Sequence, residues 1–213
     1  MKPGKMRLGY NFLRLLVLGW AKLYLGMKVF GQDNIPREGR IIIVANHISE
    51  YDPPAVGSCI PRETCYAAKA GLFKGFVGRL IRYVNGIPVR RRGSDKEAIK
   101  AMINGLQEDK AVLIFPEGTR SLDPNGLDPK AGVGMIAVMA ESDLLPVRVA
   151  GTREVPKSIF RPGHVTVQFG KRISLADLAK GSANRKETYQ KIADEIMRQV
   201  RRLAEESPSN ESV

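Results

Sequence analysis

Short continuous apolar runs alternate with helix-spaced apolar repeats along this 213-residue chain. The run Ile41-Ile42-Ile43-Val44-Ala45 is apolar at every position and rich in β-branched residues. Such a run is typical of a strand buried on both faces, as in a parallel sheet covered by helices. Similar runs predict further strands over residues 111–115, 144–149 and 165–169.

Helical periodicity fills the intervals between these runs. Ser94-Asp95-Lys96-Glu97 has the pattern of a capping box, and the apolar positions after it recur at helical spacing as far as residues 105–107. Residues 132–141 read as a short helix, and Tyr189 to Leu203 as a closing amphipathic helix. We therefore predict an α/β fold, a single domain with a mixed, largely parallel sheet flanked by helices.

The first thirty residues differ in pattern from the rest. Between Leu8 and Phe30 the longest uncharged apolar run is residues 15–21, far short of the roughly 20 residues that cross a bilayer. When this segment is projected as a helix, its polar and apolar residues fall on two separate faces. The polar face holds Arg7, Asn11, Arg14 and Lys22, and the apolar face holds Phe12, Leu16, Trp20, Leu23 and Met27.

This segment is expected to lie in a membrane interface with its basic side toward lipid phosphates. An amphipathic helix packed on the domain is the alternative. Arg14 interrupts the apolar region, which disfavours a signal peptide. We expect a peripheral or monotopic protein on the cytoplasmic face of the cell membrane.

The charge balance narrows the choice of partners. With 34 Lys and Arg against 22 Asp and Glu, the net charge is +12, which calls for an acidic partner such as an anionic membrane surface or a phosphorylated substrate. Nucleic acid is disfavoured, because aromatic residues make up 7% of the chain and no nucleic-acid-binding motif is present. Cys59, Cys65 and the two histidines lack metal-ligand spacing, so no metal site is expected.

Two polar motifs follow predicted strands. Asn46-His47, with Asp52 five residues beyond the histidine, supplies a base and a carboxylate that can orient it in a compact turn. Asp52 also precedes two prolines, so it reads equally as a helix N-cap. Phe115-Pro116-Glu117-Gly118-Thr119-Arg120 adds an arginine suited to phosphate and a glycine that permits close backbone approach.

At these motifs the chain resembles the 1-acyl-sn-glycerol-3-phosphate (lysophosphatidic acid) acyltransferases, within the glycerolipid acyltransferases. The resemblance runs from about Gly31 to about Ser174. Two further blocks of that family resemble residues 86–91, which end in Arg91, and residues 144–147. Two departures stand out: Lys69-Ala70-Gly71-Leu72 replaces the family's Lys-x-Glu-Leu, and Pro129 replaces an aromatic residue before Lys130-Ala131-Gly132.

The resemblance implies transfer of an acyl chain from acyl-CoA or acyl-carrier protein, a co-substrate and not a cofactor, to lysophosphatidic acid, giving phosphatidic acid. His47 and Asp52 would be catalytic. The substrate-binding residues would be Glu117, Gly118, Thr119, Arg120, Arg91 and Lys69, and backbone amides near Gly118 are candidates for stabilising the oxyanion.

Two other functions fit the same sequence. One is acylation of glycerol 3-phosphate or another lysophospholipid, and the other is lipid binding without catalysis, which a thiol-release assay would distinguish. We divide the chain into an interfacial segment (residues 1–30), an acyltransferase domain (31–206) and a polar tail (207–213).

Overall fold

The computed structural model describes residues 6–90, 95–121, 123, 126–155, 165–179 and 184–206. Within these residues, strands join into one sheet in the order β1-β7-β6-β2-β5-β3-β4. Their bounds are β1 Lys28–Phe30, β2 Ile41–Ala45, β3 Thr64–Lys69, β4 Gly86–Val89, β5 Ala111–Ile114, β6 Asp143–Ala150 and β7 Thr166–Phe169. From β6 to β4 all neighbours are parallel, whereas β7 runs antiparallel to β6 and parallel to β1. The predicted largely parallel sheet is confirmed.

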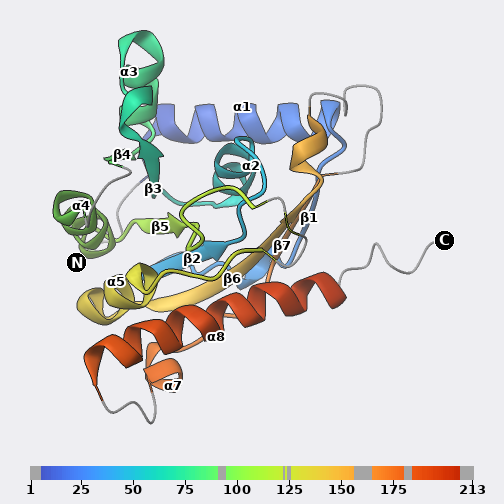
Figure 1. The fold of residues 1–213 in the computed structure, drawn as a ribbon. Coiled ribbons are helices and arrows are strands. Elements are labelled where there is room, and N and C mark those ends of the chain that lie inside the picture. The colour runs from blue at the N-terminus through green and yellow to red at the C-terminus, as the bar shows by residue number, and fades with distance from the viewer. Residues whose placement is uncertain are drawn as a thin grey trace.

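Helices cover both faces of this sheet (Figure 1). α1 and α2 pack on one face, and α4, α5 and α8 pack on the other. The helices are α1 Leu8–Tyr24, α2 Asp52–Cys59, α3 Gly75–Tyr83, α4 Lys96–Gln107, α5 Gly132–Ala140, α7 Leu175–Ala179 and α8 Arg185–Glu205, with short 3-10 helices η1 Gln32–Asn34, η2 Ala70–Leu72 and η3 Thr152–Glu154.

Strand β2 lies at the centre of the core. Ile41 and Ile43 pack in the cluster beneath α1 and α2, while Ile42 and Val44 pack in the cluster beneath α4, α5 and α8. All of these side chains are fully buried. Because successive side chains point to opposite faces of a sheet, a strand covered on both sides needs an apolar residue at every position. β3 and β4 were not predicted, since neither forms a comparable apolar run.

The helix starts are set by local hydrogen bonds. Asp95 is the N-cap of α4, and its side chain accepts a hydrogen bond from the Ala98 amide at 3.2 Å. The predicted capping box began one residue earlier, at Ser94, which lies outside the described residues, as does the predicted polar tail 207–213. α8 begins earlier than the apolar repeat predicted, because Asn184 caps it by accepting from the Glu187 amide at 3.0 Å.

Two basic residues at the N-terminal helix α1 contact the domain. Arg7 forms an ion pair with Glu63 at 2.8 Å, and Arg14 donates to the Ser58 carbonyl at 3.0 Å. The prediction that the basic side faces lipid phosphates is therefore wrong for Arg7 and Arg14, because these guanidinium groups bind partners on the domain, whereas Lys22 is exposed. Met27, assigned to the apolar face, is buried. The other apolar residues of that face point outward and are exposed: Phe12, Leu16, Trp20 and Leu23.

The first thirty residues are also joined to the domain by a strand. β1 occupies residues 28–30 and pairs with β7, so the expected boundary at residue 30 falls at the end of a strand of the sheet. Within the described part of the chain, no helix combines the length and apolar character needed to span a membrane.

Candidate active site

The sequence motifs meet at one edge of the sheet. His47 follows the end of β2, Glu117 follows the end of β5, and Thr152 follows the end of β6. These strands are neighbours in the order β6-β2-β5, with β2 in the middle and all three parallel. Their carboxyl ends therefore open at the same edge, where α/β sheets commonly bind ligands.

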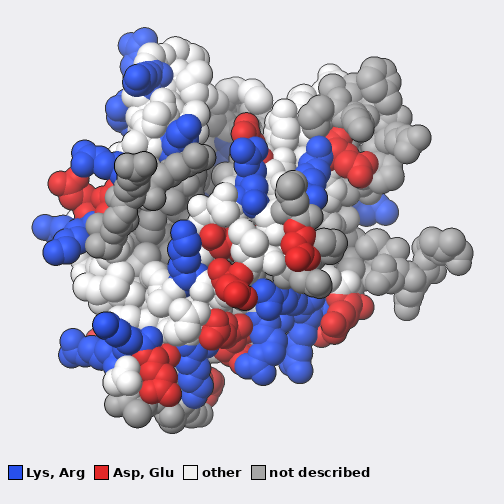
Figure 2. All heavy atoms as spheres, viewed as in Figure 1, with Lys and Arg blue, Asp and Glu red and all other residues white. Residues whose placement is uncertain are grey.

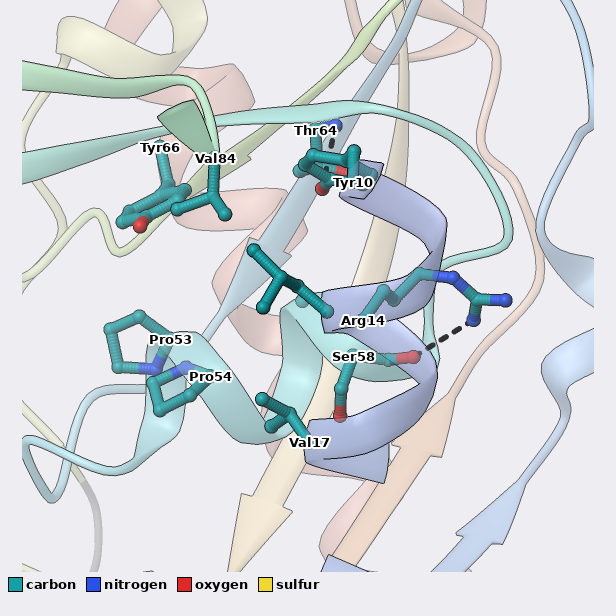
Figure 3. A pocket seen from close by; sticks show the side chains of 11 residues that line it. Tyr10, Arg14, Val17, Pro53, Pro54, Ser58, Thr64, Tyr66 and Val84 are labelled. Carbon is teal, nitrogen blue, oxygen red and sulfur yellow. Dashed lines mark hydrogen bonds between the residues drawn. The ribbon is translucent and has the colours of Figure 1, made fainter. Parts of the chain in front are cut away.

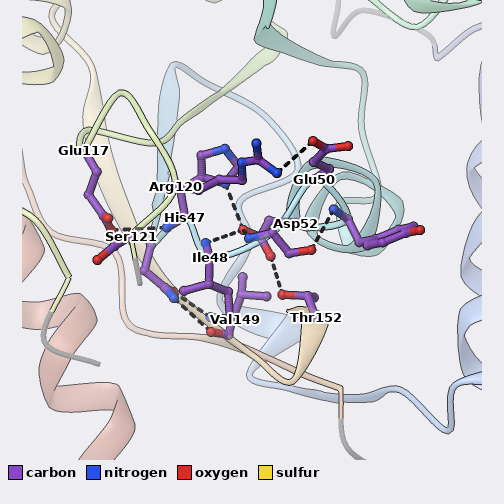
Figure 4. Close-up of polar contacts among 12 residues, drawn as sticks. His47, Ile48, Glu50, Asp52, Glu117, Arg120, Ser121, Val149 and Thr152 are labelled. Carbon is purple, nitrogen blue, oxygen red and sulfur yellow. Dashed lines mark hydrogen bonds and ion pairs between the residues drawn. The ribbon is translucent and has the colours of Figure 1, made fainter. Parts of the chain in front are cut away.

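His47 and Asp52 form a hydrogen-bonded pair (Figure 4). The Nδ1 atom of His47 lies 2.8 Å from Oδ2 of Asp52, whose side chain is fully buried. The same Oδ2 accepts from the amides of Ile48 and Ser49, both at 2.7 Å, and Oδ1 accepts from the Thr152 hydroxyl at 2.5 Å. Because an ionised carboxylate only accepts, Nδ1 carries the proton and Nε2 is left as the basic nitrogen.

Asp52 does not cap the helix that it begins. α2 starts at Asp52 with Pro53 and Pro54 in its first turn, but Tyr51 is the N-cap position and no side chain caps the helix. The predicted N-cap role of Asp52 is therefore wrong. Its carboxylate turns back toward the histidine turn, where it is held by the four donors described above.

Asn46 fixes the chain where it leaves the sheet. The Asn46 side chain is buried and donates to the Val149 carbonyl at 2.9 Å, while its oxygen accepts from the Val149 amide at 2.8 Å. One amide side chain thus bonds both backbone polar groups of Val149 at the point where the pairing of β2 with β6 ends. His47 is consequently presented from a rigid position.

Glu117 connects the two motif loops. Its buried carboxylate accepts from the His47 amide at 3.2 Å and from the Leu127 amide at 3.4 Å. Burial raises the pKa of Glu117, because the charged form is less well solvated there. The Ser121 amide adds a 2.8 Å bond to the His47 carbonyl. The Glu117 carboxylate thus links the two loops by hydrogen bonds.

Gly118 adopts a left-handed backbone conformation, with φ of 68°. A Cβ atom at this position would lie 2.7 Å from Nζ of Lys130, so the glycine lets the lysine side chain pass against the loop. The Gly118 amide, a candidate for stabilising the oxyanion, donates to the Phe115 carbonyl at 3.1 Å. It is therefore already engaged in the turn.

A polar cleft opens between the two motif loops. It has a volume of about 530 Å³. Its lining comprises Ile48, Ser49, Glu50, Tyr51, Thr119, Arg120 and Arg153. Arg120 is half exposed and forms an ion pair with Glu50, with Nη1 and Oε1 2.7 Å apart. Two guanidinium groups thus line one cleft beside the histidine turn, an arrangement suited to binding phosphate.

Arg153 and Thr152 were missed by sequence reasoning. Arg153 donates from Nε to the Ile48 carbonyl at 3.3 Å and from Nη2 to the Ser121 carbonyl, so it spans both motif loops. Both residues lie about a hundred positions from Asp52 in sequence. The available signal was their place just after a buried central strand, at the edge where His47 lies.

The remaining predicted residues are not brought into the cleft. Lys69 ends β3, one strand beyond β5, and it is not part of the described lining. Arg91 lies outside the described residues. In the described part of the chain, no cluster of side chains could hold a metal ion.

An apolar pocket of about 140 Å³ lies between α1, α2 and β3 (Figure 3). Its walls include Leu13 and Val17 of α1, Pro53 and Pro54 of α2, and Tyr66 of β3. Burial raises the pKa of Tyr66 to about 12, so this side chain stays neutral at physiological pH. The two prolines directly follow Asp52, which places the pocket next to the histidine turn.

Comparison with known proteins identifies the family of this chain. A family model described as acyltransferase matches residues 26–150. The 1-acyl-sn-glycerol-3-phosphate acyltransferase of Bacillus subtilis (strain 168) is 30% identical over 156 residues, covering 72% of this chain and 77% of that protein. The Saccharomyces cerevisiae protein of the same name is 31% identical over 188 residues, covering 83% of this chain and 61% of that protein.

A solved structure shares the fold. The crystal structure of the 1-acyl-sn-glycerophosphate (LPA) acyltransferase PlsC from Thermotoga maritima superposes with a TM-score of 0.70 at 28% identity. The match covers 92% of this chain and 81% of that one. By sequence and by fold, this chain therefore belongs to the acyltransferase family and is an O-acyltransferase.

Proposed function

We propose that this enzyme transfers an acyl chain from the thioester of acyl-CoA or acyl-carrier protein to the free hydroxyl of 1-acyl-sn-glycerol 3-phosphate, giving phosphatidic acid. The observation that carries the proposal is the 2.8 Å contact between His47 and the buried Asp52, beside a cleft lined by Arg120 and Arg153. The names of the relatives point to the same acceptor.

His47 acts as the general base in this proposal. Nε2 takes the proton of the acceptor hydroxyl while the oxygen attacks the thioester carbonyl. The Asp52 carboxylate stabilises the resulting imidazolium through Nδ1. The new ester C–O bond forms, the C–S bond breaks, and the proton leaves with the thiolate as free thiol.

Arg120 binds the acceptor phosphate in this scheme, with Arg153 as the second cation of the cleft. Guanidinium suits this role because it can donate two parallel hydrogen bonds to phosphate oxygens. The Glu50 carboxylate occupies Nη1 of Arg120 at 2.7 Å in the structure. The incoming phosphate would replace Glu50, which is largely exposed and free to turn into solvent.

The acyl chains are expected to stay in an apolar environment. The pocket between α1 and α2 has mainly apolar walls and lies next to the histidine turn, so we assign it to part of an acyl chain. The outward apolar residues of α1 fit a protein that binds the cytoplasmic face of an anionic membrane peripherally, where its lipid acceptor resides.

A thiol-release assay tests the proposal. Purified protein is incubated with acyl-CoA or acyl-carrier protein and with lysophosphatidic acid, glycerol 3-phosphate or another lysophospholipid. Released thiol is followed, and the products are identified by mass. His47→Gln should lower turnover at least about 100-fold without changing the melting temperature. Near-normal turnover in this variant, or thiol release that does not depend on an acceptor, would refute the assignment.

A further inference from the structure

We propose that α3 is a second membrane-binding element, which inserts its apolar side into an anionic lipid surface next to α1. The inference extends the membrane association in the proposed function to a helix that the sequence patterns did not single out. It rests on the exposure of α3, on its attachment, on its charge and on its contact with α1.

The apolar residues of α3 are unusually exposed. The exposed fractions are 74% for Phe76, 58% for Val77 and 42% for both Leu80 and Tyr83. At 100° per residue these side chains fall within one arc of the helix. Tyr83 touches α1 at one end of the arc, while Phe76, Val77 and Leu80 stay exposed in the described structure. A helix that belonged to the core would bury such an arc, whereas α3 turns it outward.

The opposite side of α3 packs against Phe73, a buried residue just before the helix. Gly78 is buried, and a Cβ atom there would lie 2.2 Å from the backbone carbon of Phe73, so only glycine permits this close approach. Arg82 donates to the Phe73 carbonyl at 3.0 Å and stacks over the Phe73 ring. The outward direction of the apolar arc is therefore fixed by packing.

The charge around α3 selects the partner. Residues 64–94 contain seven Lys or Arg residues and no Asp or Glu. Lys74 directly precedes α3 and Arg79 borders the apolar arc, and Figure 2 shows basic groups beside residues without formal charge over α3 at the upper left. An apolar arc next to basic residues is the pattern of a helix that lies in an anionic membrane interface.

The apolar surfaces of α1 and α3 meet. Tyr83 at the end of α3 lies against Gly9 of α1, where a Cβ atom would be 2.1 Å from its hydroxyl oxygen, and Arg7 donates to the Tyr83 carbonyl at 2.9 Å. Leu8 and Phe12, 86% and 66% exposed, continue the apolar surface along α1. Figure 1 shows α3 rising beside one end of α1. Both helices can therefore contact one lipid surface together.

Vesicle binding by the full chain tests the inference. Flotation with phosphatidylcholine vesicles, with and without phosphatidylglycerol, is measured for wild type, Phe76→Ser/Leu80→Ser and Arg79→Gln. Met139→Ser is the matched control, because Met139 is 56% exposed but lies on α5, on the opposite face of the sheet. Melting temperatures should agree across the set, since every changed side chain is exposed.

The double variant should bind phosphatidylglycerol-containing vesicles at least about tenfold more weakly than wild type, and the control should bind equally well. Arg79→Gln should lose affinity for these vesicles and not for pure phosphatidylcholine. Unchanged affinity in the double variant would overturn the inference. A wild-type dimer that the double variant converts to monomer, with vesicle binding intact, would instead assign the surface to a second copy of the chain.

Acyl transfer to a monomeric short-chain lysophosphatidate should be unaffected in the double variant, whereas transfer to the same acceptor class in vesicles should fall. A wild-type enzyme without acyl transfer would refute the proposed function while leaving the vesicle-binding result to stand on its own.

Discussion

Asp52→Asn separates the charge of the carboxylate from its geometry. Oδ2 accepts from His47, Ile48 and Ser49, and Oδ1 accepts from the Thr152 hydroxyl. An asparagine can place its oxygen at the Oδ2 position and keep all three acceptor roles. Its amino group then faces the Thr152 hydroxyl, which can accept as well as donate. The variant therefore keeps the shape of the turn and loses only the negative charge.

The size of the effect follows from the short contact. Two unit charges 2.8 Å apart attract by about 6 kcal/mol at an effective dielectric constant of about 20. This is an upper bound, because the His47 side chain is 20% exposed. A hydrogen bond to a charged group contributes about 1.5–3 kcal/mol, which sets the lower bound. At about 1.4 kcal/mol per tenfold in rate, we expect kcat to fall by about 10–10⁴-fold.

Steady-state thiol release against lysophosphatidate concentration measures this effect. The acceptor KM should change little, because Asp52 is buried and does not line the polar cleft. Combining Asp52→Asn with His47→Gln should cost hardly more than His47→Gln alone, since the pair acts as a unit. A single Asp52→Asn variant with kcat within about threefold of wild type would show that Asp52 only shapes the turn.

Two further changes examine the cleft and the buried carboxylate. Arg120→Gln should raise the KM for lysophosphatidate about tenfold or more with little change for its dephosphorylated analogue, because one charged donor to phosphate is lost; equal KM changes for both acceptors would contradict the phosphate role. Thr152→Val removes the hydroxyl that binds Oδ1 of Asp52 and should destabilise the protein by about 2 kcal/mol. Thermal melts should show a drop of about 4–8 °C, and a melting temperature within a degree of wild type would exclude this contribution.

The positions of His47 and Asp52 could be predicted because the signals are local. The apolar run from Ile41 to Ala45 predicts a buried central strand, and parallel strands have their carboxyl ends at one edge of the sheet. His47 and Asp52 are only five residues apart, so one turn decides their contact. The strand and the spacing together were enough to place the pair.

Contacts over long sequence separation could not be predicted in this way. Thr152 reaches Asp52 across 100 residues, and nothing near Thr152 marks it as a partner. The prediction of which residues of α1 face the domain was wrong for the same reason. The helical projection separates its two faces, but only the positions of Glu63 and the Ser58 carbonyl decide which face turns inward. A periodic pattern shows which residues share a face of the helix, but it does not show what that face contacts.

The paired hydrogen bonds of Asn46 with Val149 have a consequence for water at the catalytic edge. Where one strand of a sheet ends, the next strand is left with unpaired backbone N–H and C=O groups, and water usually hydrogen-bonds to them. Here the buried Asn46 side chain bonds both peptide groups of Val149, so neither group needs a water molecule as a partner. An aspartate in its place would offer no donor to the Val149 carbonyl. Water could then bind that carbonyl, and we would expect the rate of thioester hydrolysis to rise.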